Sequence, residues 1–299
     1  MSANIKDLIK EKRENLSNSS LTTYASILKN LHKKVFEDKT FSLSDFNETN
    51  KVLDYLKDVP PNKRKTILSA LVIISTDKVA DEYRSKMNED VSAYNAEIQK
   101  QTKTQTQKEN WVEVNEIQEI FKNLENNAKI IYKKTNKSVS DLQAIQNYII
   151  VALLGGMFIA PRRSLDFVNF RIRGDINREK ENYLEKNKLV FNSYKTFKTY
   201  GRQEVEIPKT LKSILTKWIK LNPTDYLLFD GNMNQLSSVK LNQRMNRIFG
   251  NRAISVNAMR HTYLTDKYKK TSEKNKQLAE DMTNMGSSVN MADTYIKLK

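Results

Sequence analysis

Residues 142–167 read LQAIQNYIIVALLGGMFIAPRRSLDF and contain the most apolar helical pattern in the chain. The apolar side chains recur at the three-and-four spacing of one buried stripe, which predicts a helix at the centre of a core. The glycine pair at 155–156 ends this helix, and Pro161 cannot donate a helical hydrogen bond. Arg162 and Arg163 follow among apolar neighbours, which is an unusual setting for two permanent charges.

A small β structure and further helices are expected after this segment. The runs at 189–191 and 205–207 are β-type, and the connection between them contains Gly201, so the pattern predicts a β-hairpin. Helices are expected at 211–218, 237–249 and 256–268. Residues 111–299 therefore read as a mixed α/β domain, mainly helical with a small β-hairpin or sheet.

The first hundred residues read as a helical domain. Apolar spacing predicts helices at 21–35, 50–59, 67–74 and 77–98. Residues 99–108 contain no apolar side chain, so they cannot offset their ordering entropy in a core. We expect domains at 1–100 and 111–299 with a linker at 101–110. The alternative for the linker is the frayed end of a long surface helix.

The charge balance points to a polyanionic partner. The chain has 51 Lys and Arg against 35 Asp and Glu, a formal net charge of +16. Residues 1–110 hold 19 basic and 16 acidic side chains, and residues 111–299 hold 32 and 19. The second region is therefore the main anion-binding body, and nucleic acid is the simplest partner. A ribosome-associated protein, or one that merely adheres to nucleic acid, has a similar composition.

The composition also excludes several classes of protein. No 18-residue apolar run spans a bilayer and no apolar segment follows Met1, so we expect an intracellular protein, in the cytoplasm or nucleus, without membrane contact. The chain has no Cys and only two His, which excludes disulfide scaffolds, thiolate nucleophiles and Cys- or His-rich metal sites. We expect neither a metal nor another cofactor.

Basic side chains at helix starts are the first candidates for anion contacts. Arg260 and His261 lie near the start of an expected helix, where free N–H groups and the helix dipole favour an anion. Lys63, Arg64 and Lys65 lead into another helix and would grip phosphates. Ordinary solvated charge is an equally good explanation for these three.

Four motifs in order resemble those of the tyrosine recombinases, or phage-type integrases, over essentially the whole chain. The first is an arginine with an acid three residues later, Arg163 and Asp166, which favours Arg163 over Arg162 as the matching residue. The second is a lysine followed by threonine in a hairpin, and both Lys195 and Lys198 fit it.

The other two motifs lie further along the chain. The sequence NAMRH resembles the family's His-x-x-Arg-His, with Arg260 as its second arginine and Asn257 in place of its first histidine. The sequence MGS resembles Leu-Gly-His, with Ser287, or Gly286 if the spacing is kept, in place of histidine. Tyr295 stands where the family has its nucleophile. The two missing histidines indicate a divergent branch, from a virus or a mobile element.

The resemblance implies a site-specific recombinase that cleaves and rejoins DNA strands. Arg163 and Arg260 would hold the non-bridging oxygens of the phosphate. Tyr295 would form a 3′-phosphotyrosyl intermediate, and Lys195 would protonate the leaving 5′ oxygen. Because the ester conserves the energy of the broken bond, no ATP is needed.

The resemblance also assigns the remaining candidates. Asn257 and Ser287 would hydrogen-bond a phosphate oxygen in place of the missing histidines. Contacts with DNA are expected from Arg162, Lys198, His261, Lys63, Arg64 and Lys65. The first domain resembles the family's core-binding domain, which closes with the catalytic domain around double-stranded DNA. Strand exchange implies a tetramer of two dimers on paired sites.

Alternatives stay open for individual residues and for the function. Arg162 or Arg163 could form a buried ion pair with Asp166. His261 could be a packed helix residue, and Tyr295 could fill a hydrophobic groove. A type IB topoisomerase shares the same chemistry, and a non-catalytic DNA-binding protein would keep only the clamp.

Overall fold

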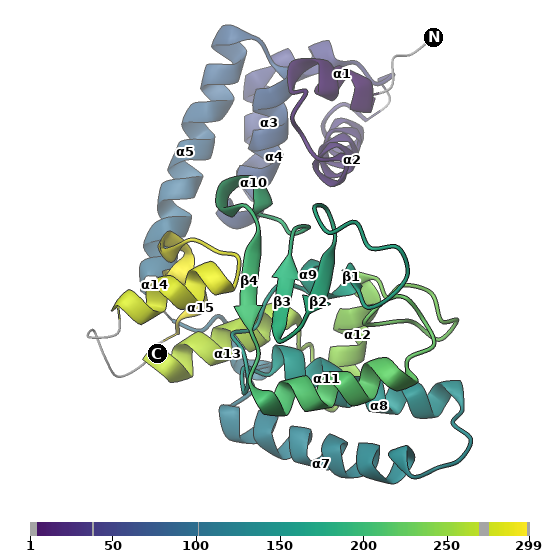
Figure 1. The fold of residues 1–299 in the computed structure, drawn as a ribbon. Coiled ribbons are helices and arrows are strands. Elements are labelled where there is room, and N and C mark those ends of the chain that lie inside the picture. The colour runs from purple at the N-terminus through teal and green to yellow at the C-terminus, as the bar shows by residue number, and fades with distance from the viewer. Residues whose placement is uncertain (1–4, 38, 101, 269–274, 298–299) are drawn as a thin grey trace. The chain divides into compact units, whose positions relative to one another are not determined.

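Two compact units make up the chain, Met1–Lys100 and Gln101–Lys299 (Figure 1). The computed structural model describes residues 5–37, 39–100, 102–268 and 275–297. Each unit has its own core of buried apolar side chains.

The described part of the first unit is helical, as predicted. Its elements are α1 (Ile5–Lys12), α2 (Asn18–Val35), the 3-10 helix η1 (Leu43–Asn47), α3 (Thr49–Leu56), α4 (Pro61–Ile74) and α5 (Asp77–Gln99). Helix α4 packs against α1, α2 and α5, and Leu28, Leu68 and Tyr83 are fully buried in this core. The apolar stripe of each helix decides which face is buried.

The cations at the start of α4 differ from the exposed patch that the sequence suggested. Arg64 donates from Nε and Nη2 to the two carboxylate oxygens of Asp90, at 2.8 and 2.7 Å, and from Nη1 to two carbonyls at the end of α3. Lys65 places its Nζ 3.1 Å from the centre of the Tyr94 ring. Arg64 and Lys65 therefore contact α5 in this structure, and the expectation that they bind DNA stays a prediction. Of the three cations, Lys63 alone is exposed.

We predict that Arg64→Met destabilises the first unit by about 3 kcal/mol, because the buried Asp90 carboxylate loses its partner. Lys63→Met removes an exposed cation from the same helical turn and should change the free energy of unfolding by no more than about 0.5 kcal/mol. Urea unfolding of the full chain measures both. Equal effects of the two substitutions would show that the contact between Arg64 and Asp90 does not stabilise the unit.

The second unit contains a four-stranded sheet (Figure 1). The strands are β1 (Phe170–Arg171), β2 (Asn182–Glu185), β3 (Lys188–Phe191) and β4 (Gln203–Glu206), in that spatial order. β1 and β2 are parallel, and the other two pairs are antiparallel. β3 and β4 form the predicted hairpin, and their connection contains the short helix α10 (Phe197–Tyr200).

Helices surround this sheet and form most of the second unit. They are α6 (Gln105–Glu109), α7 (Val114–Tyr132), α8 (Val139–Leu154), α9 (Ser164–Val168), α11 (Lys209–Leu221), α12 (Ser238–Ile248), α13 (Val256–Tyr268), α14 (Asn275–Asn284), the 3-10 helix η3 (Val289–Met291) and α15 (Ala292–Tyr295). Helix α8 packs against α7 and α11, and its residues 148–154 are all buried, which confirms the predicted central helix. The mainly helical fold class with a small sheet is confirmed. No helix among the described residues is long and apolar enough to cross a membrane.

The segment expected to be a linker contains α6 and is attached to the second unit. A capping box at Thr104 begins the helix. The Asn110 side-chain oxygen accepts the Ala253 N–H at 2.7 Å, and the Val112 carbonyl accepts the Thr262 hydroxyl at 2.8 Å. The segment has no apolar side chain to bury, as the sequence indicated. Helix capping and hydrogen bonds nevertheless order it.

Candidate active site

The first of the two adjacent arginines, Arg162, is buried and links several elements of the second unit. Arg162 is fully buried, and its Nε donates to Asp166 Oδ2 at 2.8 Å. Its Nη1 donates to the Gln203 side chain at 2.8 Å and to the Asn284 carbonyl. Its Cζ lies 3.9 Å from the centre of the Phe191 ring. The expected DNA contact of Arg162 is therefore corrected, because the buried ion pair left open by the sequence is the arrangement found.

Desolvation acts on both members of this pair. It lowers the pKa of Arg162 and raises the pKa of Asp166, since a buried site disfavours both charged forms. The ion pair and the hydrogen bonds around it oppose that effect. Nη2 of Arg162 is buried and has no hydrogen-bond partner in the described part of the chain.

The second arginine joins three of the expected motifs. Arg163 is half-buried, donates from Nη1 to the Gly286 carbonyl, and donates from Nη2 to Ser287 Oγ at 3.3 Å. The Thr196 hydroxyl donates to the same Gly286 carbonyl at 2.6 Å. The connection that carries Lys195 therefore meets Arg163 and the end of α14 at a single backbone oxygen.

Gly286, which the motif match gave only as an alternative to Ser287, takes part at this meeting point through its backbone. Its φ is +67°, a left-handed conformation that favours glycine. A Cβ there would lie 3.2 Å from Arg162 Nη2, 3.3 Å from Tyr194 Cδ2 and 3.4 Å from Arg163 Nη1. Gly286 enters the site through its carbonyl oxygen, which no side-chain pattern reveals.

We predict that Gly286→Ala destabilises the protein by about 1–3 kcal/mol through its positive φ and adds a displacement of Arg162 and Arg163. Gly250→Ala is the matched control, because Gly250 has φ +72° and nothing within 4 Å of an added Cβ. Thermal unfolding measures the loss of stability in both variants. Gly250→Ala reports the cost of the positive φ alone, and Gly286→Ala reports that cost together with the crowding of the added Cβ. If Gly250→Ala is as harmful as Gly286→Ala, crowding by the two arginines contributes nothing.

Arg260 is the most deeply buried charge without an acidic partner in the site. It is 1% exposed, and its Nε and Nη2 have no hydrogen-bond partner among the residues that the structure describes. Its Nη1 donates to the Met285 carbonyl at 3.4 Å, and its Cζ lies 4.5 Å from the centre of the ring of Tyr295, which is also buried. Burial lowers the pKa of Arg260 to about 10, so the guanidinium stays charged at neutral pH.

His261 contacts the backbone of Tyr295 and not a free surface. Its Nδ1 lies 2.7 Å from the Tyr295 carbonyl oxygen, and its Nε2 lies 3.2 Å from Asn257 Nδ2. Thr265 donates to the same carbonyl at 3.4 Å. His261 is 6% exposed, so its expected contact with DNA is corrected: both ring nitrogens already have partners within the chain.

We predict a pH dependence of stability from His261, because burial lowers its pKa from 6.5 to about 4. Between these values the unfolded chain binds the proton and the folded chain does not, so stability falls as the pH falls below about 6.5. The loss is about 2 kcal/mol at pH 5 relative to pH 8. Denaturation from pH 8 to pH 4 should show this loss in the wild type and not in His261→Asn. Parallel curves for the two proteins would contradict the assignment.

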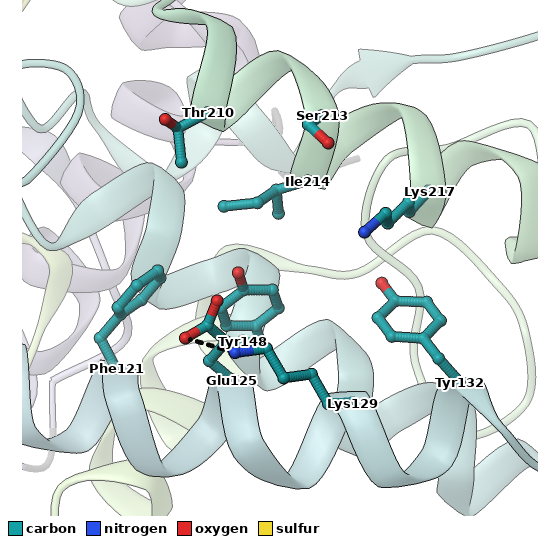
Figure 2. A pocket seen from close by; sticks show the side chains of 9 residues that line it. All are labelled: Phe121, Glu125, Lys129, Tyr132, Tyr148, Thr210, Ser213, Ile214 and Lys217. Atoms are coloured by element: carbon teal, nitrogen blue, oxygen red, sulfur yellow. Dashed lines mark ion pairs between the residues drawn. The ribbon is translucent and has the colours of Figure 1, made fainter.

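Two cavities accompany these elements. One of about 170 Å³ lies beside Asn257 and His261 and is also lined by Asn110 and Trp111. The other, of about 190 Å³, lies between α7, α8 and α11 (Figure 2). Phe121, Tyr132, Tyr148 and Lys217 are among its lining residues, with an ion pair between Glu125 and Lys129 at its edge. None of the candidate site residues lines this second cavity.

Three solved structures are similar to this chain. Two are of a lambda integrase dimer bound to a COC′ core site, with TM-scores of 0.55 and 0.54 and 14% identity; they cover 98% and 97% of this chain and 94% and 76% of theirs. The third is XerA recombinase, with a TM-score of 0.44, 11% identity, and coverage of 98% of this chain and 93% of that one. The chain has the tyrosine recombinase fold. No protein-family model and no curated protein sequence matches it.

Within this tyrosine recombinase fold, the structure gathers most of the residues chosen from the sequence. Arg163 contacts Ser287, and Arg260 lies against the ring of Tyr295. Lys195 and Lys198 are both exposed in the connection between β3 and β4.

Proposed function

We propose that the protein cleaves and rejoins DNA strands through a covalent bond between a 3′ phosphate and Tyr295. The supporting observation is uncompensated positive charge: Arg162, Arg163 and Arg260 all act electrostatically on one carboxylate, that of Asp166. Two nitrogens of Arg260 and one of Arg162 are buried donors without partners among the described residues. Such donors are costly to bury, and a phosphate that accepts their hydrogen bonds would remove that cost.

The chemistry follows from the groups around this charge. The phenolic oxygen of Tyr295 attacks the phosphorus, and the bond from phosphorus to the 5′ oxygen breaks. Arg163 and Arg260 stabilise the charge that develops on the non-bridging oxygens, as preorganised donors do in other phosphoryl transfers. Attack by a 5′ hydroxyl on the phosphotyrosyl bond reverses the step and rejoins the strand.

Lys195 is the proposed acid for the leaving 5′ oxygen. Its neighbour Thr196 is hydrogen-bonded to the Gly286 carbonyl, which also accepts from Arg163. Lys198 lies in α10, and among the described residues no hydrogen bond of its own neighbours Phe197 and Thr199 reaches the arginines or the Gly286 carbonyl. This difference supports Lys195 over Lys198 as the proton donor.

Duplex DNA is the proposed partner. The excess of 32 basic over 19 acidic side chains in residues 111–299 supports it, and so does the similarity to lambda integrase, which is bound to a core site. The helical unit would act as a core-binding domain, and a tetramer of two dimers would bring two sites together. A role in a virus or a mobile element belongs to the same proposal.

The decisive experiment looks for the covalent adduct. Duplexes that bind are selected from a random pool, and a selected sequence is nicked so that cleavage releases a short 5′-hydroxyl fragment. We predict that the adduct accumulates on a denaturing gel and forms in EDTA, because the guanidiniums supply the charge. Tyr295→Phe should abolish the adduct and keep DNA binding. Arg163→Ala and Arg260→Ala should each slow its formation by about 10²–10³-fold.

The same assay tests the acid. A substrate with sulfur in place of the scissile 5′ oxygen needs no proton on the leaving group, so it should rescue Lys195→Ala. Rescue of Lys198→Ala instead would move the acid to that residue. Binding to the selected DNA without any adduct would favour a non-catalytic DNA-binding protein, and an adduct on another tyrosine would overturn the assignment of Tyr295.

A further inference from the structure

Three polar residues of α13 lie one helical turn apart and lead to Tyr295. Asn257, His261 and Thr265 have the i, i+4 and i+8 spacing that places side chains on one face of a helix. His261 and Thr265 both contact the Tyr295 carbonyl, at 2.7 and 3.4 Å. Thr265 also accepts the Lys297 N–H at 2.8 Å, so the backbone on both sides of Ile296 is tied to α13.

The partners of His261 determine where its proton lies. A carbonyl oxygen only accepts hydrogen bonds, so Nδ1 of His261 must carry the hydrogen that reaches Tyr295. In a neutral imidazole Nε2 is then an acceptor, and the Asn257 amide nitrogen donates to it at 3.2 Å. The hydrogen bond from Asn257 therefore favours the same tautomer as the Tyr295 carbonyl does.

The charges around the ring favour the neutral form. Arg260 on α13 and Lys297 after α15 both oppose a positive charge on His261, and burial acts in the same direction. The Tyr295 ring also packs against the His261 imidazole, and the centres of the two rings lie 5.2 Å apart. The hydrogen bond to the Tyr295 carbonyl acts in the opposite direction and favours the proton.

This arrangement fixes the position of Tyr295 relative to that of Arg260. Arg260 and His261 are adjacent in α13, so one helical turn carries the guanidinium and the anchor of the tyrosine backbone. The Arg260 Cζ lies 4.5 Å from the centre of the Tyr295 ring. A shift of α15 along α13 would change this distance directly.

We propose that Asn257, His261 and Thr265 are positioning residues that fix Tyr295 relative to Arg260. The inference rests on the proposed function, because it assumes that Tyr295 is the nucleophile. It replaces the expectation that Asn257 hydrogen-bonds a phosphate oxygen. In this chain Asn257 acts on His261, and His261 acts on the backbone of the tyrosine.

Single-turnover cleavage of the nicked duplex tests the anchor. His261→Leu removes the donor and should slow adduct formation by about 10²-fold, the effect of misplacing a reacting group by about 1 Å. DNA affinity should stay the same. His261→Asn places an N–H near the position of the lost Nδ1–H. Its rate of adduct formation should therefore be at least tenfold higher than that of His261→Leu. Asp266→Asn, an exposed change on the same helix, is the matched control and should have no effect.

A small nucleophile separates positioning from phosphate binding. Hydroperoxide can attack the phosphorus and expel the 5′ oxygen in Tyr295→Phe, where no tyrosine needs to be positioned. Adding His261→Leu or Asn257→Leu to Tyr295→Phe should leave this cleavage unchanged, because Arg163 and Arg260 still bind the phosphate. If peroxide-driven cleavage falls with the second substitution, these residues act on the phosphate and the inference is wrong.

The outcomes also separate this inference from the proposed function. If the wild type forms an adduct and His261→Leu forms it equally fast, the anchor has no role although the enzyme is correctly assigned. If neither adduct formation nor peroxide-driven cleavage occurs, the proposed function fails first. Should His261→Leu not fold, Asn257→Leu, a change at an exposed residue, measures the same loss of rate. ¹⁵N NMR of the imidazole should show the Nδ1–H tautomer at pH 7, and the other tautomer would contradict the proposal.

Discussion

The ion pair between Arg162 and Asp166 is the contact on which the rest of the site depends. Arg162 binds Asp166 in α9, Gln203 in β4 and the carbonyl of Asn284 at the end of α14, and its guanidinium lies over Phe191 in β3. Four elements, α9, β3, β4 and α14, therefore contact one side chain. Because both members of the pair are fully buried, losing either one would leave an unpaired charge in the core.

This pair also explains why the neighbouring arginines remain available. Asp166 forms its ion pair with Arg162. Among the described residues, Arg163 and Arg260 have no carboxylate of their own, and they interact with the carbonyls of Gly286 and Met285. The fold thus keeps one guanidinium, that of Arg260, beside Tyr295 and a second, that of Arg163, against Gly286 and Ser287. Under the proposed function, a phosphodiester would supply the missing negative charge, and the stability of the site would then be linked to the binding of its substrate.

The sequence predicted the elements better than it predicted the role of each charge. The stripes of α2 and α8 and the β3–β4 hairpin follow from periodicity, which depends on local burial. The order of the motifs predicted that Arg163, Arg260, Ser287 and Tyr295 belong to one site, and Arg163 contacts Ser287 while Arg260 contacts Tyr295. Whether a cation is paired depends on distant residues such as Asp90 for Arg64, so periodicity could not reveal it. The contribution of Gly286 is a backbone carbonyl, and no residue type encodes that.

The most direct test of the central claim is a crystal structure of Tyr295→Phe with the nicked duplex. The account predicts that the non-bridging oxygens of the scissile phosphate lie within hydrogen-bonding distance of Arg163 and of the Nε and Nη2 of Arg260. It also predicts that the ion pair of Arg162 with Asp166 is unchanged. A phosphate bound elsewhere, with the two Arg260 nitrogens still without a partner, would contradict the account.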